Sequence, residues 1–329
     1  MYSNSGDMWM RIFLTGGSGF VGRNLITTLV QRGFEVRSLV KWQNEIELIK
    51  SYGAIPIFGD INDFQALKSG MEGCNVVFHV AAKVDDWGVL KDFQQVNICG
   101  TEQVIAAAKA TGISRLVYVS TEAVLIGGKP IINTDETRLL PKKPLGFYPL
   151  TKAIAEKKVI EANSDTLTTV VVRPRFVWGK GDTTLLPRFL KTMREGNFAW
   201  ISGGHYPTST CHVKNLCHGL ICAAERGKGG EIYFITDGSP VDFRSFITEL
   251  ARTQGVEPGT RTIPRWFVWF LAWSLENVWN LFKLEDSPPI TRTGLSMIAG
   301  EVTVDDTKAR REIGYQTIIS RQEGILEMI

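Results

Sequence analysis

The chain has 329 residues, a length that suits one large domain or two unequal ones better than a single small core. Its 44% hydrophobic and 22% charged residues are ordinary for a soluble globular protein, and a net charge of +3 argues against nucleic acid as the main partner. Five scattered cysteines and an N-terminus without a basic-then-apolar pattern predict neither a disulfide frame nor a signal peptide, and therefore a cytoplasmic protein.

Up to residue 174, short apolar runs alternate with helical patterns, which predicts βαβ units and a parallel sheet. The expected strands are residues 10–15, 35–40, 55–58, 76–80, 116–120 and 168–173, and the expected helices are 21–32, 45–52, 64–69, 92–110 and 148–163. After residue 174 the regular alternation of strand and helix patterns ends. The expected elements there are helices at 185–195 and 213–225 and a strand at 231–236. We therefore expect an α/β fold. A Rossmann-type doubly wound sheet would occupy residues 1–174, and a smaller, mostly helical substrate domain residues 175–329, with some elements returning to the first domain.

The stretch TGGSGFVG joins the first strand to the first helix and has the spacing of a phosphate-binding turn. Gly16 would permit the tight turn, Gly19 would let backbone N–H groups approach a pyrophosphate, and Gly22 would let helix and strand pack closely. A dinucleotide diphosphate would then lie at the positive end of the helix, beside Phe20 and Val21. A tight turn that binds nothing is the alternative.

The end of the second strand bears on the choice of cofactor. An NAD site normally has a carboxylate there, about 20 residues after the glycines, which binds the ribose 2′-hydroxyl. This chain has Val40 and then Lys41 instead of a carboxylate, and Lys41 could neutralise a 2′-phosphate. We predict NADP(H) as the preferred cofactor and NAD(H) as the alternative. For Arg37, on the same strand, a solvated strand-end charge is the favoured interpretation.

The motif YPLTK places Tyr148 and Lys152 on one face of a helix. The strand that ends in LVYVS delivers Ser120 and Thr121 to the carboxyl edge of the sheet, where open α/β folds bind ligands. A free tyrosine has a pKa of about 10, so Tyr148 needs the positive charges of Lys152 and an oxidised nicotinamide to act as a base near neutrality. Thr121 would hold the substrate oxygen while hydride is transferred. These catalytic candidates predict an alcohol/ketone oxidoreductase.

The stretch CHVKNLCH brings two cysteines and two histidines close together. Their spacing is not that of a zinc site, and the apolar positions predict a buried helical stripe, so we expect no metal. The residues of this stripe are Val213, Leu216, Cys217, Leu220 and Ile221.

The segment from Ile263 to Phe282 carries four of the nine tryptophans. Its apolar run is too short to span a bilayer. It is either a buried helix or an amphipathic helix that covers an apolar ligand or rests on a membrane interface.

Nearly the whole chain resembles the extended short-chain dehydrogenase/reductases, and within them the 3β-hydroxysteroid dehydrogenase branch. This branch includes sterol 4α-carboxylate 3-dehydrogenases and bacterial 2-alkyl-3-oxoalkanoate reductases. The resemblance is carried by GDINDFQALKSGMEGCNVVFHVAAKVDDWG, VNICGTEQVIAAAKATGISRLVYVS, FYPLTKAIAEKKVI, VVRPRFVWGKGD and, later, HVKNLCHGLICAAE, GEIYFITDGSPVDF and KARREIGYQ. It implies that Thr121 is the catalytic Ser/Thr, Tyr148 the base and Lys152 its partner.

The resemblance also implies the remaining cofactor contacts. Asp60 and its neighbour Ile61 would lie by the adenine, and Pro174 would border the nicotinamide. His79 is interpreted as a hydrogen-bonded residue at a strand end rather than as a proton donor. The ribose would be lined by the residues that follow His79, and a structural Asn would lie beside the site; these are Ala81, Ala82, Lys83 and Asn97.

The implied substrate is apolar: a 3β-hydroxysteroid or sterol-like compound, with a long-chain 2-alkyl-3-oxoacid as the alternative. Nucleotide-sugar epimerisation or reduction is a second hypothesis, which would require polar and cationic diphosphate contacts in the second half. A cofactor-sensing binding protein without turnover is a third, and the intact Thr121, Tyr148 and Lys152 argue against it. A homodimer and a peripheral membrane contact through the Trp-rich segment are the partner hypotheses.

Overall fold

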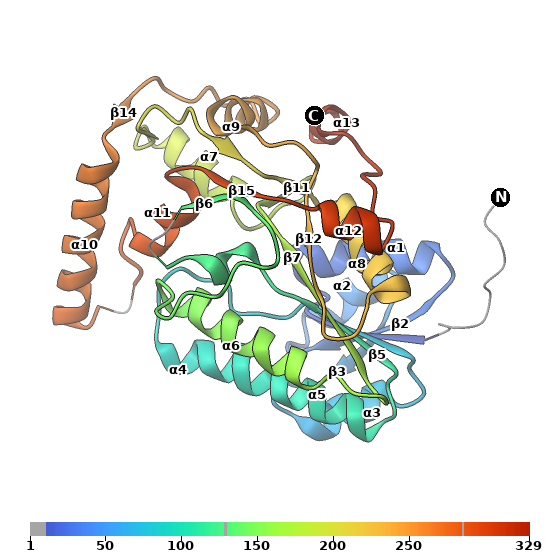
Figure 1. Ribbon diagram of the computed structural model, residues 1–329. Helices are drawn as coiled ribbons and strands as arrows, with labels where there is room; N and C mark the ends of the chain where they lie inside the picture. Colours follow the sequence, from blue (N-terminus) through green and yellow to red (C-terminus); the bar gives the residue numbers. More distant parts are fainter. Residues whose placement is uncertain (1–10, 128–129, 285) are drawn as a thin grey trace.

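The computed structural model describes residues 11–127, 130–284 and 286–329 (Figure 1). The N-terminal residues on which the signal-peptide prediction depends, and the predicted start of the first strand at residue 10, lie outside this description. At the centre is a seven-stranded sheet in the order β12-β7-β5-β4-β1-β2-β3, parallel throughout. Its strands in chain order are β1 (Arg11–Thr15), β2 (Glu35–Val40), β3 (Ile55–Phe58), β4 (Val76–His79), β5 (Arg115–Val119), β7 (Thr168–Pro174) and β12 (Ile232–Ile235).

This strand order confirms the prediction of a doubly wound Rossmann-type sheet. The chain moves outward from β1 to β3 and then resumes on the other side of β1 with β4. Open α/β sheets bind dinucleotides outside the carboxyl ends of the strands at such a reversal, which here lies between β1 and β4.

Helices cover both faces of the sheet because successive strand residues point to opposite sides. Ile12 and Leu14 of β1 pack into one hydrophobic cluster, and Phe13 between them packs into the other. The first face carries α1 (Phe20–Gln31), α2 (Glu45–Ser51) and α8 (Val213–Arg226), and the second carries α3 (Phe64–Met71), α5 (Gly100–Ala110) and α6 (Phe147–Glu161).

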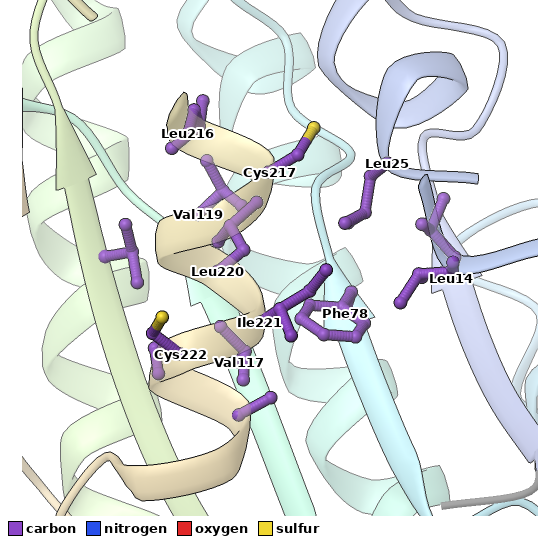
Figure 2. Packing of buried hydrophobic residues seen from close by; sticks show 14 of the residues in the cluster. Leu14, Leu25, Phe78, Val117, Val119, Leu216, Cys217, Leu220, Ile221 and Cys222 are labelled. Carbon is purple, nitrogen blue, oxygen red and sulfur yellow. The ribbon is translucent and has the colours of Figure 1, made fainter. Parts of the chain in front are cut away.

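The helix α8 comes from the second half of the sequence yet belongs to the core of the central sheet. Figure 2 shows its apolar face against Val117 of β5, Phe78 of β4 and Leu14 of β1. All five residues of the predicted stripe are buried, including Cys217. Cys211 and Cys217 pack in this core, and the side chain of His212 caps α8 by accepting the N–H of Lys214. No group of three or more potential metal ligands occurs among the described residues.

The helix predicted over residues 92–110 is interrupted. The structure has a short helix α4 (Leu90–Phe93), a π-helical turn η1 (Gln94–Cys99) and then α5. Such single π-turns inside helices are often found at functional sites. The turn carries Asn97, whose side-chain contacts below account for it.

The remaining elements form a second layer above the carboxyl edge of the sheet (Figure 1). A small sheet has the order β13-β10-β15-β6, and an aromatic cluster that includes Phe176, Trp178, Trp200 and Phe243 fills the space between this layer's helices. The elements are η2 (Glu122–Leu125), β6 (Ile131–Thr134), β8 (Val177–Trp178), α7 (Leu186–Arg194), β9 (Trp200–Ile201), β10 (Pro207–Thr208), β11 (Cys211–His212), β13 (Val241–Asp242), α9 (Phe243–Arg252), β14 (Thr262–Ile263), α10 (Arg265–Phe282), α11 (Arg292–Ile298), β15 (Val302–Val304) and α13 (Arg321–Leu326). The helix α12 (Thr307–Glu312) instead packs beside β12 in the core of the central sheet.

The Trp-rich segment forms α10, which stands along the outer side of the molecule with α11 next to it (Figure 1). Of its 18 residues, Val268, Ala272 and Glu276 are the buried ones. In this chain α10 is therefore not the buried helix that the first interpretation expected, because its sequence supplies more apolar side chains than α11 can cover. Within the described parts of the chain, every helix is too short or too polar to cross a bilayer.

Candidate active site

In the turn between β1 and α1, other parts of the protein approach the glycines too closely for most of them to carry a side chain. Gly16 has φ +78°, and a Cβ at this position would lie 2.6 Å from the backbone nitrogen of Ala81. A Cβ on Gly22 would collide with the carbonyl oxygen of Gly16, and one on Gly17 with the Ser38 hydroxyl. Gly19 differs, since its Cβ would meet Gly16 O at an ordinary 3.4 Å. The need for Gly17 was missed from the sequence.

The N-terminus of α1 is open to an anion. Gly19 is the N-cap and provides no side-chain oxygen, so the N–H groups of Phe20, Val21 and Gly22 have no partner within the helix. The first turn also contains no acidic residue. Free N–H groups and the helix dipole favour a phosphate at such an end. The cradle thus fits the diphosphate of a dinucleotide.

Two carboxylates lie at the end of β2, where the sequence indicated none. Lys41 Nζ is 3.0 Å from Asp60 Oδ2 and 5.1 Å from the centre of the Trp42 ring. The first-turn residue Glu45 of α2 accepts the N–H groups of Lys41 and Trp42 at 3.0 and 3.1 Å, and the hydroxyl of Ser18 at 2.7 Å. Although partial burial opposes it, hydrogen bonds from the following turn and from Lys41 hold the pKa of Asp60 below its ordinary value. The Lys41 charge is therefore already balanced in the protein alone.

Asn97 fixes the loop that follows β4. Its side-chain oxygen accepts the N–H of Lys83 at 2.8 Å, and its nitrogen donates to Lys83 O at 3.1 Å and to Thr151 Oγ1 at 3.0 Å. Since Thr151 lies on α6, one buried amide ties the loop of Ala81 and Ala82 to the helix of the tyrosine motif.

His79 is buried and hydrogen-bonded at both ring nitrogens, to Thr15 Oγ1 at 2.8 Å and Thr101 Oγ1 at 2.9 Å. Thr101 gives its own proton to Asn97 O, so Nε2 of His79 must carry the ring hydrogen and Nδ1 must accept from Thr15. Burial, with Lys152 nearby, lowers the pKa of His79 to about 3. The ring is neutral, which agrees with its interpretation as a structural residue.

The structure brings the three catalytic candidates together. Tyr148 lies in the first turn of α6, close enough to Thr121, which follows β5, for the threonine hydroxyl to favour the ionised form of the phenol. Lys152, one turn further along, donates to Val119 O of β5 at 2.7 Å, and its Nζ lies 4.1 Å from the centre of the Tyr118 ring. Thr121 and Lys152 are buried in the protein alone, and Tyr148 is partly buried.

The charge states of these groups follow from their burial. Burial raises the pKa of Tyr148 well above its ordinary value; Glu122 adds to this rise, and the hydrogen bond with Thr121 opposes it. Burial lowers the pKa of Lys152 to about 7, against the opposing charge of Glu156. At neutral pH Tyr148 is thus a neutral phenol that can donate a proton, and Lys152 releases its proton more readily than an exposed lysine does.

Two buried ion pairs next to the catalytic candidates were not predicted from the sequence. Glu156 accepts from Arg173 Nε at 2.9 Å and from the Ser120 hydroxyl at 2.6 Å. Glu122 lies 3.2 Å from Arg175 NH1 and accepts the Thr121 hydroxyl at 2.9 Å. One sequence feature could have indicated these buried ion pairs, namely a charged residue inside or next to an apolar strand pattern, as in VVRPR and VSTE.

The helix α11 packs against the catalytic candidates through Met297. Thr291, its N-cap, donates to Asp86 Oδ2 at 2.7 Å. Met297 packs in the same apolar cluster as Tyr148, and its carbonyl accepts from Arg175 at 2.6 Å. The GKGD loop, residues 179–182, and α7 line an open cleft of about 600 Å³. Leu186 and Leu190 are among its lining residues. Pro174, at the end of β7, is buried beside β12.

Comparison with known proteins agrees with this arrangement. Residues 13–265 match the model of the 3-beta hydroxysteroid dehydrogenase/isomerase family. The chain is 46% identical over 316 residues to a 4-hydroxy-2-methyl-3-oxo-4-farnesyl-3,4-dihydroquinoline-1-oxide ketoreductase of Stigmatella aurantiaca, covering 96% of this chain and 95% of that protein. It is 31% identical to a decarboxylating sterol-4-alpha-carboxylate 3-dehydrogenase of Dictyostelium discoideum, covering 96% and 99% of the two chains.

A solved structure shares the fold. The UDP-glucuronic acid 4-epimerase of Bacillus cereus, in complex with NAD, superposes with a TM-score of 0.74 over 97% of both chains at 20% identity. Together, the family match and the Rossmann-type sheet show that the chain belongs to the 3-beta hydroxysteroid dehydrogenase/isomerase family and is a nicotinamide-dependent oxidoreductase of hydroxyl and keto groups.

Proposed function

We propose that the protein interconverts a ketone and a secondary alcohol on a ring that is attached to a large apolar body. The observation that carries this proposal is the meeting of the neutral phenol of Tyr148 with Thr121 at the end of β5 and with Lys152 one helical turn further along α6. The names of both relatives describe oxygen chemistry on a ring within an apolar molecule, a farnesylated quinoline oxide in one and a sterol in the other. Residues 1–174 would bind the cofactor and residues 175–329 the substrate.

The residues divide the reaction as follows. When bound, the reduced nicotinamide supplies hydride to the carbonyl carbon. Tyr148 gives its proton to the carbonyl oxygen, so one C–H and one O–H bond form and the C=O double bond becomes a single bond. Thr121 holds that oxygen beside the phenol. Protonated Lys152 stabilises the phenolate that remains. Oxidation of the alcohol uses the same steps in reverse.

The proposed cofactor-binding residues lie at the glycine turn and near the carboxyl ends of the strands of the central sheet. The diphosphate would bind at the N-terminus of α1, the adenosine beside the end of β2, and the nicotinamide between β7 and the tyrosine. The residues are Gly16, Gly19, Phe20, Val21, Gly22, Lys41, Asp60, Ile61, Ala81, Ala82, Lys83, Asn97, Tyr148, Lys152 and Pro174.

A substrate panel tests this function. It consists of a prenylated cyclic ketone, a 3-keto sterol, a long-chain 2-alkyl-3-oxoacid and UDP-glucose, each followed by oxidation of the reduced nicotinamide. We expect the highest kcat/KM with one of the two cyclic ketones. A preference for the oxoacid would support the long-chain alternative, and turnover of UDP-glucose would overturn an apolar substrate.

We also propose that NADP(H) binds more tightly than NAD(H), by roughly five- to hundred-fold, through Lys41. An exposed ion pair with phosphate is worth about 1 kcal/mol or less, and a charge-assisted hydrogen bond about 1.5–3. To make these contacts, Lys41 must exchange Asp60 for the 2′-phosphate, which keeps the preference moderate. Replacing Val40 with Asp and Lys41 with Ala should reverse the order of the two dissociation constants.

Both cofactors should be titrated at one ionic strength, because salt screens the phosphate contact. Arg37→Gln is the matched control, since Arg37 is bound to Glu35 at 3.1 Å and to Glu72 O at 2.9 Å, and the variant should keep the parent's order. If the parent itself prefers NAD(H), then Lys41 serves only its ion pair with Asp60.

The outer face of α10 is proposed to rest on an anionic lipid surface. Trp266 is 72% exposed and Phe282 is 68% exposed. Arg265 and Lys283 flank the helix, and its one acidic residue, Glu276, is buried and paired with Arg292 at 2.6 Å. Basic ends around an exposed aromatic face are typical of interfacial helices. The exposed apolar side chains are Trp266, Phe267, Phe270, Leu271, Trp273, Val278, Leu281 and Phe282.

The double change Trp266→Ser and Phe270→Ser should weaken binding to vesicles of mixed neutral and anionic phospholipid by more than about tenfold. Each aromatic side chain is worth about 1.5–3 kcal/mol on full transfer from water, and both lie outside the protein core. The melting temperature should change little. Leu139→Ser is the control, because Leu139 is also exposed, to 88%, but lies on a loop elsewhere.

Co-sedimentation with the vesicles measures this binding, and light scattering reports the oligomeric state. Unchanged vesicle binding in the double variant would contradict the membrane contact. A parent dimer that the double change converts to a monomer, without any vesicle binding by the parent, would assign the face to a second copy of the chain.

A further inference from the structure

A buried ion pair next to the catalytic threonine remains without a role in the reaction described so far. Glu122 is 4% exposed and Arg175 is 2% exposed. Glu122 begins the 3-10 turn that follows Thr121, and Arg175 follows the last residue of β7, Pro174. Burying two charges costs free energy that their attraction often does not recover, so a neutral pair would give at least equal stability.

The pair is linked to the reaction site through one hydroxyl. Thr121 donates its hydroxyl proton to Glu122 Oε2 at 2.9 Å and accepts the N–H of Ala123 at 3.1 Å. A threonine hydroxyl has one proton to donate and two lone pairs. Glu122 therefore takes the proton and the N–H of Ala123 occupies one lone pair, which leaves Thr121 its second lone pair for the site.

Arg175, the other member of the pair, is hydrogen-bonded to α11 and β10. Arg175 contacts Glu122 Oε1 through NH1 at 3.2 Å, and through NH2 it donates to Thr208 Oγ1 at 3.2 Å and Met297 O at 2.6 Å. An arginine has donors only, so the atom of residue 122 that faces Arg175 must be an acceptor. This fixes which oxygen of Glu122 remains for Thr121.

We propose that Glu122, held by Arg175, is a positioning residue that orients the Thr121 hydroxyl as an acceptor toward the substrate oxygen. This inference rests on the alcohol/ketone function proposed above. While Tyr148 is still a neutral phenol, an accepting Thr121 can receive the O–H of a bound alcohol, which must turn to Tyr148 before its proton is transferred, whereas a bound ketone must draw the Thr121 proton away from Glu122. The carboxylate thus favours binding of the alcohol over the ketone. Its charge also helps to raise the pKa of Tyr148, after the larger effect of burial.

The substitution Glu122→Gln tests this role because it keeps the shape and reverses one hydrogen bond. Since Arg175 requires an acceptor, the amide oxygen of the glutamine will face Arg175 and its NH2 group will face Thr121. The hydroxyl must then accept from the glutamine and donate into the site. We expect the ratio of KM for the alcohol to KM for the ketone to rise about fivefold or more, the effect of one hydrogen bond.

The pH profile gives a second readout. Removing the negative charge beside Tyr148 should lower the pKa of its phenol, so the pH dependence of kcat/KM for alcohol oxidation should move by about one unit toward acid. If Glu122→Gln does not fold, the double variant Glu122→Gln with Arg175→Met removes both charges and should show the same acid shift.

The matched control is Asp306→Asn, at the N-cap of α12. Asp306 is also buried, accepts a threonine hydroxyl (Thr236, 2.7 Å) and pairs with an arginine (Arg310, 2.7 Å). It should lose stability without a change in the KM ratio or the pH profile. An unchanged KM ratio and pH profile in a folded Glu122 variant would overturn the positioning role. The proposed function itself fails only if the parent turns over no ketone or alcohol.

Discussion

Replacing Tyr148 with Phe should lower kcat by about 10²–10⁴-fold, the usual contribution of a positioned general acid or base. The variant loses only the hydroxyl that exchanges a proton with the substrate oxygen, while the ring keeps its place in the cluster with Leu145 and Met297. The dissociation constant of the cofactor should therefore stay nearly unchanged. Steady-state kinetics and a cofactor titration measure the two quantities separately.

Tyr233→Phe is the control for this experiment. Tyr233 is a buried tyrosine on β12 of the same sheet, and its hydroxyl makes only longer contacts, with Lys228 N at 3.2 Å and Glu312 at 3.4 Å. Its loss should leave kcat unchanged. Near-normal turnover by Tyr148→Phe would rule out the phenol as the proton donor and would require a different acid at the site.

Gly19→Ala should weaken cofactor binding by at least about tenfold without destabilising the protein. A Cβ at this position meets Gly16 O at 3.4 Å, and its φ of −73° is accessible to alanine, so the fold should accept the change. The new methyl group would instead occupy space at the end of α1 where a diphosphate must approach. Charge-assisted hydrogen bonds lost there are worth about 1.5–3 kcal/mol each.

Two further glycine variants separate ligand binding from folding. Gly22→Ala should lower the free energy of unfolding by ~1–3 kcal/mol or more, because its methyl group collides with the backbone of Gly16. Gly259→Ala should change neither property, since nothing lies within 4 Å of its Cβ. Calorimetry of the protein alone, followed by cofactor titration, measures both effects. Normal cofactor affinity in Gly19→Ala would show that no phosphate approaches this turn.

The sequence determined those features that depend on neighbouring residues. The period of two in β1, with Ile12 and Leu14 on one side and Phe13 on the other, is written in consecutive letters and was read correctly as a parallel strand. The glycine turn and the Tyr148/Lys152 pair also have fixed local spacing. The family resemblance, which covers nearly the whole chain, was confirmed by the family match.

Features that depend on distant residues could not be read in this way. Glu45 reaches the glycine turn through Ser18, 27 positions earlier, and Arg175 reaches Glu122 from another strand. The π-turn carries Asn97, whose one amide side chain binds both the loop after β4 and α6. Hydrophobic periodicity does not report which polar groups meet.

The Trp-rich segment shows this division most clearly. Its sequence determined a helix with apolar residues on several sides, and it excluded a bilayer span by length. Whether those side chains are buried depends on what packs against them, which the segment itself does not encode. Only the tertiary structure decided this, because α11 covers the side of α10 around Val268 and Ala272 and leaves Trp266 and Phe270 exposed.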